Sequence, residues 1–266
     1  MNIFVLTKQV PDTSEIKIDP VKNTLIRDGV PSILNPYDAC ALEKALQLKD
    51  KNPEIKVYCI SMGPPQAEGM LKDCIAVGAD GAYLITDRKF AGSDTLATSY
   101  ILSSAIRKVE ELVGKAEIIF AGKQAIDGDT AQVGPEIAEE LDYAQITYGI
   151  DSELDGDKIR VIRQLDLGDQ KVESSFPVLV TFTKTDDLRF PNMRNKLKAR
   201  KAEIPQITFA DMPNIDETRI GLKGSPTRVR KTYTPSVTKE GLIIQGKKSQ
   251  EAVDELVAAL EKVKLF

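Results

Sequence analysis

The stretch AGKQAIDGDTAQVGP, residues 121–135, has the residue types of a phosphate-binding turn but not the spacing of a common one. It matches neither GxGxxG nor GxxxxGKS/T, the glycine-rich patterns that hold nucleotide phosphates. It follows a strand-like run, and Gly122 and Gly128 allow a ligand to approach the backbone closely. Residues 130–132 have the pattern of a helix start, where free amides and the helix dipole favour an anion.

Two aspartates give this stretch a negative charge where a phosphate would be repelled. Asp129 and Gln132 have the spacing of a capping box, so Asp129 is expected to cap a helix that starts at Thr130. Asp127 either orders the turn or accepts a hydrogen bond from a ribose hydroxyl. Pro135 would then bend that helix, or the helix restarts with Gly134 as its cap. Spacing alone leaves an ordinary strand–helix turn and a nucleotide cradle equally open.

The sequence contains no histidine, which excludes a Ser-His-Asp triad, a Cys-His pair and a histidine zinc site. Acid–base chemistry at neutral pH would fall to carboxylates, Lys, Cys or Tyr with shifted pKa values. The three cysteines, Cys40, Cys59 and Cys74, have no CxxC spacing. We interpret them as small core residues of a protein in a reducing cytoplasm, without a disulfide framework or an iron–sulfur cluster. A binding or cofactor-holding role is favoured, and no catalytic or metal-ligating residue is predicted.

Charge and hydropathy narrow the class of partner. The 266-residue chain carries a net charge of −4, which gives no general reason to expect nucleic-acid binding. No run approaches the roughly 18 apolar residues of a membrane span, and the first residues enter a strand directly rather than a signal peptide. We therefore expect a cytoplasmic protein without membrane insertion.

Strand-like and helix-like segments alternate over the first half of the chain. Strands are predicted at 2–10, 55–63, 81–86 and 116–122, and helices at 36–50, 65–77 and 95–113. Pro36 after Asn35, Gly78 and Asp94 supply the expected helix ends. Residues 15–33 form a hairpin or an extended excursion. The alternation predicts an α/β fold with a mainly parallel sheet flanked by helices. Ligands bind at the carboxyl edge of such a sheet, here near 7–13, 35–38, 61–66 and 121–135.

The second half has a different pattern. Strands at 158–165, 170–176 and 177–183 are predicted as antiparallel additions to the same sheet. The basic stretch 186–201 has three interpretations: a solvated loop, a nucleic-acid site, or a docking loop for an acidic partner. An acidic overall charge and a lone aromatic, Phe190, weaken the second interpretation. The final segment, 249–266, carries an apolar helical stripe that covers either its own domain or a partner subunit. That stripe consists of Val253, Leu256, Val257, Leu260 and Val263.

Four segments together resemble the β subunit of electron transfer flavoprotein. They are VLTKQVPDT, GVPSILNPYDACALEKALQLK, GKQAIDGDTAQVGPEIAEEL and LRFPNMRNKLKARK. The resemblance covers most of the chain, and KQAID followed by a short turn is distinctive. It implies an adenine nucleotide alpha hydrolase-like fold and a heterodimer with an FAD-bearing α subunit. In that family the β subunit itself holds AMP in simple electron carriers and a second FAD in electron-bifurcating ones.

The resemblance also implies roles for individual residues and segments. The expected nucleotide contacts are Leu6, Thr7, Asn35, Tyr37, Asp38, Met62, Gly122, Lys123, Gln124, Ala125, Asp127, Gly128, Asp129, Thr130, Ala131, Gln132, Val133 and Gly134. The expected partner contacts are Leu188, Arg189, Phe190, Pro191 and Met193. Residues 1–205 would form the nucleotide-binding domain, including a partner-recognition loop at 186–201. Residues 206–266 would form an extended arm whose helix packs on the α subunit.

Residues 10–13 and the DGDTAQVGP turn resemble the bifurcating, FixA-like branch. This implies an FAD that accepts hydride from NADH, a reaction for which no protein base is needed. One electron would pass to ferredoxin or flavodoxin, and the other through the α-subunit FAD to an acyl-CoA dehydrogenase. One alternative is a subunit with structural AMP in a carrier that accepts electrons from dehydrogenases. Another is a stress-type nucleotide-binding or ATP-hydrolysing domain, which leaves the basic stretch and the arm unexplained.

Overall fold

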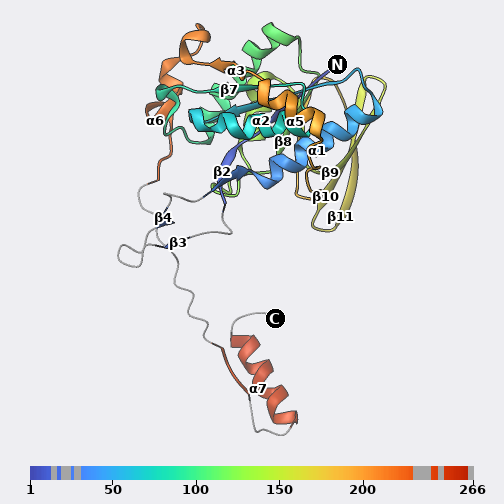
Figure 1. Ribbon diagram of the computed structural model, residues 1–266. Coiled ribbons are helices and arrows are strands. Elements are labelled where there is room, and N and C mark those ends of the chain that lie inside the picture. Colours follow the sequence, from blue (N-terminus) through green and yellow to red (C-terminus); the bar gives the residue numbers. More distant parts are fainter. Residues whose placement is uncertain (13–16, 19–24, 27–30, 230–240, 245–248, 263–266) are drawn as a thin grey trace.

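The computed structural model describes residues 1–12, 17–18, 25–26, 31–229, 241–244 and 249–262. Within them, the main sheet has nine strands in the order β11-β10-β9-β12-β8-β1-β6-β7-β13 (Figure 1). Their bounds are β1 Asn2–Leu6, β6 Lys56–Met62, β7 Gly81–Ile85, β8 Ile118–Gly122, β9 Ala144–Asp155, β10 Lys158–Leu165, β11 Gly168–Ser175, β12 Val178–Phe182 and β13 Gln206–Ile207. The strands from β12 to β13 in this order run parallel, which confirms the predicted fold class.

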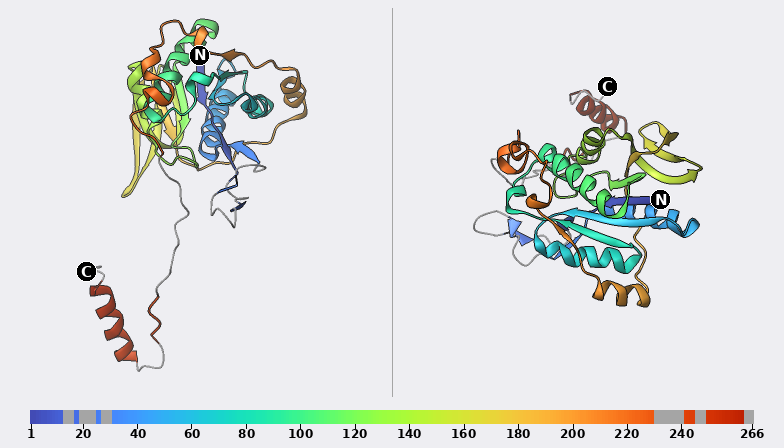
Figure 2. Two further views of the ribbon diagram at one scale, coloured as in Figure 1. Left: turned by 90° about the vertical axis from the view of Figure 1, so that its left-hand side faces the viewer. Right: turned by 90° about the horizontal axis from the view of Figure 1, so that it is seen from above.

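Helices cover both faces of the sheet (Figure 2). One face packs against α1 (Pro36–Lys51), α2 (Glu68–Val77) and α5 (Met193–Lys201). The other packs against α3 (Thr95–Val113), α4 (Val133–Leu141) and the short α6 (Gly221–Gly224). Alternation along each strand supplies both cores: Val5 lies in the first cluster and Phe4 in the second. Cys40, Cys59 and Cys74 are free and buried, which confirms them as core residues.

Most predicted element ends in the first half are confirmed. Helix α1 begins at Pro36, and the carboxylate of Asp94 caps α3 by accepting a hydrogen bond from the amide of Ala97 at 3.1 Å. A short 3₁₀ turn, Pro65–Ala67, precedes α2, and Gly78 ends this helix with a φ of 137°. The short strands β3 (Lys17–Ile18) and β4 (Leu25–Ile26) pair antiparallel, as in the hairpin considered for 15–33, most of which lies outside the described residues.

Two strand predictions need correction, and one strand was missed. The strand expected over 2–10 ends at Leu6, and β2 (Gln9–Pro11) pairs antiparallel with β5 (Ser32–Leu34) in a separate sheet. Strand β12 runs parallel between β8 and β9 rather than antiparallel. All five of its residues are buried, as expected for a strand with covered faces. Strand β9 was not predicted. It begins beside β12 and continues into the β10–β11 hairpin, where the expected antiparallel pairing is confirmed.

The basic stretch and the expected arm also differ from prediction. The second part of 186–201 is helix α5, which Asn192 caps by accepting from the amide of Asn195 at 2.8 Å. The first part of 206–266 packs on the α/β body, because β13 pairs with β7 and Met212, Ile215 and Ile220 are buried. The helix was not predicted because most of its residues are charged and only one of them is buried. The packing of 206–224 was not predicted because its apolar residues are few and widely spaced.

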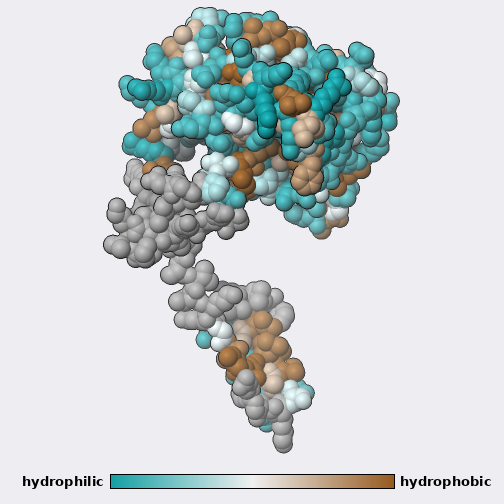
Figure 3. Space-filling model, viewed as in Figure 1, coloured by the Kyte–Doolittle hydropathy of each residue, from teal (hydrophilic) through white to brown (hydrophobic). Residues whose placement is uncertain are grey.

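Helix α7 (Ser249–Lys262) stands apart from the α/β body (Figure 1). Three residues of its predicted apolar stripe are exposed, Leu260 is partly buried, and Figure 3 shows hydrophobic side chains gathered on this helix. Val253, Leu256 and Val257 expose between 41% and 52% of their surface, whereas Val263 lies outside the described residues. No described helix combines the length and the apolar character needed to cross a membrane.

Candidate functional site

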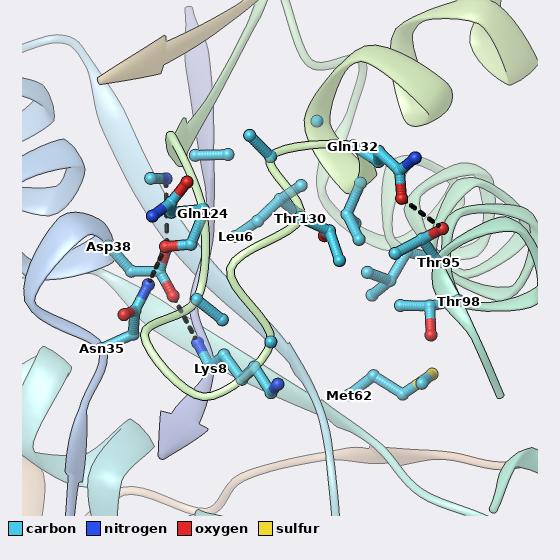
Figure 4. Close-up of a pocket in the computed structure, with 18 of the residues that line it drawn as sticks. Leu6, Lys8, Asn35, Asp38, Met62, Thr95, Thr98, Gln124, Thr130 and Gln132 are labelled. Carbon is cyan, nitrogen blue, oxygen red and sulfur yellow. Dashed lines mark hydrogen bonds between the residues drawn. The ribbon is translucent and has the colours of Figure 1, made fainter. Parts of the chain in front are cut away.

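A cavity of about 360 Å³ lies at the carboxyl edge of β1, β6 and β8 (Figure 4). Its walls come from the segments that follow these strands and from the first turns of α3 and α4. Fifteen of the predicted nucleotide contacts line it: Leu6, Thr7, Asn35, Asp38, Met62, Gly122, Lys123, Gln124, Ala125, Gly128, Thr130, Ala131, Gln132, Val133 and Gly134. Tyr37, Asp127 and Asp129 do not line it. The structure thus brings four separate predicted segments to one cavity.

Asp38 joins the ends of two parallel strands to the start of α1. One carboxylate oxygen accepts a hydrogen bond from the amide of Lys8 at 2.8 Å, and the other accepts from the amide of Gly122 at 3.0 Å. A Cβ atom on Gly122 would lie 2.4 Å from this carboxylate, so only glycine fits there. Burial raises the pKa of Asp38 to about 7, although the side chain of Asn35, the two amides and the charge of Lys8 act in the opposite direction. Asp38 therefore fixes the cavity floor, because both of its oxygens are used within the protein.

Asn35 holds the turn that follows β8. Its side-chain amide donates to the carbonyl of Gln124 at 2.8 Å, and its oxygen accepts from the amide of Ile126 at 3.2 Å. Asn35 occupies the N-cap position of α1 as predicted, but its side chain makes no capping hydrogen bond. The side chain of Asn35 thus both donates to the turn and accepts from it, and Asn35 is fully buried. Asn35 therefore connects the start of α1 to the turn through hydrogen bonds.

The two aspartates of the turn contact the protein rather than the cavity. Asp127 forms an ion pair with the ammonium of Lys8 at 2.7 Å, which joins this turn to the segment after β1. Asp129 accepts a hydrogen bond from the side chain of Gln124. This ion pair orders the turn, which is one of the two uses expected for Asp127. The capping role expected for Asp129 is wrong, because the helix begins four residues later.

Helix α4 begins at Val133, with Gln132 at the N-cap, and not at Thr130 as predicted. Asp129 and Ala131 each have a φ of 55°, a left-handed conformation that breaks the expected helix start. Pro135 is the third helical residue, where its missing amide costs no hydrogen bond, so neither the bend nor the restart is needed. No described residue accepts a hydrogen bond from the amides of residues 130–134. Free amides in alternating conformations at a helix start form a concave binding site for anions.

The wall beside the start of α4 was missed by the sequence analysis. It consists of the residues that precede α3 and of the first two turns of that helix. Thr95 Oγ1 donates to Gln132 Oε1 at 3.0 Å, and Figure 4 shows Thr95 and Thr98 across the cavity from Asn35 and Asp38. The missed lining residues are Lys8, Ile60, Ser93, Asp94, Thr95, Thr98, Leu102 and Ala121. The sequence did contain a signal for this wall. Asp94 was predicted to start a helix after the parallel strand 81–86, and such a loop lies at the carboxyl edge of the sheet, where the other lining segments lie.

The predicted partner contacts lie on a different side of α1. Phe190 and Met193 expose 97% and 73% of their surface. Leu188 packs partly against the core, and Arg189 forms an ion pair with Glu43. Pro191 is half-buried. The segment therefore has a fixed base and two exposed apolar side chains.

The geometry supports binding more strongly than acid–base catalysis. Asp38 has a pKa near neutrality, but both of its oxygens accept backbone amides. Lys123 lines the cavity, and its ammonium lies 5.2 Å from the centre of the Tyr148 ring. Among the described residues, no cluster of three or more acidic or cysteine side chains is placed to hold a metal ion. Free amides, hydroxyls and a lysine around one cavity are groups that bind a nucleotide phosphate.

Comparison with known proteins gives consistent results. The electron transfer flavoprotein domain matches residues 22–212. The chain is 48% identical to the electron transfer flavoprotein subunit beta of Megasphaera elsdenii over 271 residues, covering 100% of both chains. It is 44% identical to the caffeyl-CoA reductase-Etf complex subunit CarD of Acetobacterium woodii, over 98% of both chains. It is 43% identical to protein FixA of Azorhizobium caulinodans, over 98% of this chain and 94% of that one.

Proposed function

Because the chain belongs to the electron transfer flavoprotein family, as a β subunit that pairs with an α subunit, we propose that its cavity holds an FAD used in electron bifurcation. The observation that supports this most directly is that residues 130–134, whose amides have no acceptor among the described residues, line a cavity built from the expected segments. In this proposal the protein acts only as a heterodimer. The flavin would accept hydride from NADH and release electrons to ferredoxin or flavodoxin and, through the α-subunit FAD, to an acyl-CoA dehydrogenase.

The cavity fits the part of the ligand that AMP and FAD share. Its volume of about 360 Å³ lies at the lower end of the range for ligand pockets, roughly 300–1,000 Å³. We expect the amides of residues 130–134 and the ammonium of Lys123 to bind phosphate oxygens. Thr95 and Thr98 line the cavity from the start of α3. The isoalloxazine ring would then extend out of the cavity toward the α subunit.

The choice of FAD over AMP depends on the sequence of the turn and on relatives. Residues 10–13 and the DGDTAQVGP turn resemble the FixA-like branch, and a relative named FixA is 43% identical. A relative named as an Etf subunit of a caffeyl-CoA reductase complex supports an association with acyl-CoA-type redox partners. The alternative is structural AMP in a non-bifurcating carrier. We expect both ligands to use the same phosphate-binding groups. The family assignment rests on the comparisons and holds in either case.

The same proposal assigns the remaining segments. Residues 188–193 would contact the acyl-CoA dehydrogenase, with Phe190 and Met193 as its apolar contacts. Residues 1–224 would form the nucleotide-binding body, since 206–224 packs on it. The arm would begin after Gly224 and end in α7, which packs on the α subunit. We propose a cytoplasmic location for the heterodimer.

A flavin count on the co-purified heterodimer tests the cofactor. We expect two FAD per heterodimer, and bleaching of flavin absorbance when NADH is added anaerobically. One FAD with one AMP, and no bleaching by NADH, would contradict the bifurcation proposal and support the carrier. Gly134→Ala provides a site-specific test, because its Cβ would lie 2.5 Å from Thr181 Cγ2 and displace the start of α4. This variant should lose nucleotide from the β subunit while the α-subunit FAD is retained.

A further inference from the structure

The segment proposed to contact the dehydrogenase lies along α1. We call residues 186–193 the docking segment. Thr185, just before it, lies with its hydroxyl 3.5 Å from the thiol of Cys40, near the start of α1. Asp186 and Arg189 contact residues further along the same helix. The docking segment is thus attached to a helix whose first turn forms the floor of the nucleotide cavity.

Arg189 and Glu43 form the most extensive of these attachments. The guanidinium donates from Nε to Oε2 and from NH2 to Oε1, both at 2.9 Å, which is the bidentate arrangement. The backbone amide of Arg189 also donates to Oε2, at 3.1 Å. The side chain of Glu43 is only 9% exposed. Hydrogen bonding to Glu43 raises the pKa of Arg189, and a second carboxylate, Asp50, lies 2.8 Å from the guanidinium.

Lys44 provides a second attachment one residue along the helix. Its ammonium lies 2.8 Å from the carboxylate of Asp186 and 3.3 Å from that of Asp151 on β9. The lysine side chain is 7% exposed, and hydrogen bonding to Lys44 lowers the pKa of Asp186. Gln47 donates to the same aspartate at 3.2 Å. Both ends of the stretch 186–189 are therefore bound to α1.

Phe190 is the residue directly after this bound stretch, and it is almost fully exposed. An exposed aromatic side chain contributes to docking only if its backbone is held, because a mobile loop loses conformational entropy when it binds. Three hydrogen bonds from Arg189 to one buried carboxylate hold this backbone. We infer that Glu43 is a positioning residue for partner docking, which presents Phe190 and Met193 through Arg189. This inference rests on the proposed contact between the docking segment and an acyl-CoA dehydrogenase.

The test uses the complete heterodimer with Glu43→Gln, which keeps the side-chain size and removes the charge. Hydrogen exchange in the docking segment should become about tenfold faster, because a hydrogen bond to a charged group contributes at least this factor to a local opening equilibrium. With a purified acyl-CoA dehydrogenase as the electron acceptor, KM for the dehydrogenase should rise severalfold while kcat stays close to wild type. Flavin content and NADH oxidation with a dye acceptor should not change.

Arg189→Lys is the second variant, and it keeps the charge but loses the bidentate geometry. The lysine ammonium still compensates the buried carboxylate of Glu43, and this variant should show the same two changes. The matched control is Lys49→Gln on the same helix. It removes an ion pair of 2.7 Å with Asp80 without touching the docking segment, and it should leave exchange there and KM unchanged.

Phe190→Ala separates the inference from the proposed function. It should raise KM for the dehydrogenase without accelerating exchange in residues 186–189. If Phe190→Ala leaves KM unchanged, the docking proposal itself fails. If it raises KM while Arg189→Lys and Glu43→Gln leave either exchange or KM at wild-type values, docking stands and the role of Glu43 is wrong. An equal loss in Lys49→Gln would also overturn this role, because it would indicate a general effect on α1.

Discussion

At the scale of single residues, Asp38 links the cavity floor to the pH dependence of stability. Burial raises its pKa from 3.8 to about 7. The folded protein therefore retains a proton that the unfolded chain releases between these two values. The free energy of unfolding must fall as pH rises through this window and level off above pH 7. Across these roughly three pH units the free energy of unfolding should fall by about 4 kcal/mol at most, since each unit of pKa shift contributes about 1.4 kcal/mol.

Asp38→Asn should remove this part of the pH dependence. The amide cannot titrate, and its oxygen can accept from only one of the amides of Lys8 and Gly122. We expect lower stability below pH 5, by about 1–3 kcal/mol, and a flatter profile from pH 5 to 7. Thermal unfolding of the heterodimer across this range measures both effects. Asp127→Asn, in the turn that follows β8 and outside the cavity, is the control. A wild-type slope in Asp38→Asn would contradict the assignment.

At the scale of elements, the site depends on how closely the end of β8 meets the start of α1. A Cβ on Gly122 would lie 2.6 Å from the Cβ of Tyr37 as well as against Asp38, so the two elements would have to separate. Gly128 has no heavy atom within 4 Å of its Cβ position. Gly122→Ala should cost about 1–3 kcal/mol through overpacking, whereas Gly128→Ala should stay within about 0.5 kcal/mol of wild type. Urea unfolding midpoints of the two heterodimers measure this difference, and equal midpoints would show that the close contact is not required.

The elements also show what the sequence could predict. Strong periodicity and the Asn35-Pro36 pair predicted α1, and the carboxyl edge of the parallel strands predicted the place of the cavity. The direction of β12 was predicted wrongly, although its continuous apolar run is typical of a parallel strand covered on both faces. The predicted start of α4 was wrong. The capping-box spacing indicated a helix from Thr130, but Asp129 and Ala131 adopt left-handed conformations that the sequence does not indicate. The α3 wall was missed because its threonines resemble ordinary helix residues.

At the scale of the whole molecule, two regions expose apolar side chains away from the cavity. The docking segment exposes Phe190 beside the body, while α7 exposes an apolar stripe at a distance from it (Figure 1). The two regions differ in how they contact the α/β body. Glu43 and Lys44 bind the docking segment to the body, but no residue of α7 is buried. A surface that the body does not cover is consistent with the proposed packing of α7 on the α subunit.

Truncation after residue 248 tests this division of the molecule. The body should remain folded, because its core clusters contain no residue of α7. Affinity for the α subunit should fall by at least tenfold, since burying even one large apolar side chain contributes about 1.5–3 kcal/mol. Leu256→Asp should weaken association similarly, whereas Glu251→Gln on the same helix should not. Sedimentation of titrated subunits measures the affinities. Wild-type affinity in the truncated chain would reject α7 as an arm, and loss of the folded body would show that this helix stabilises the β subunit itself.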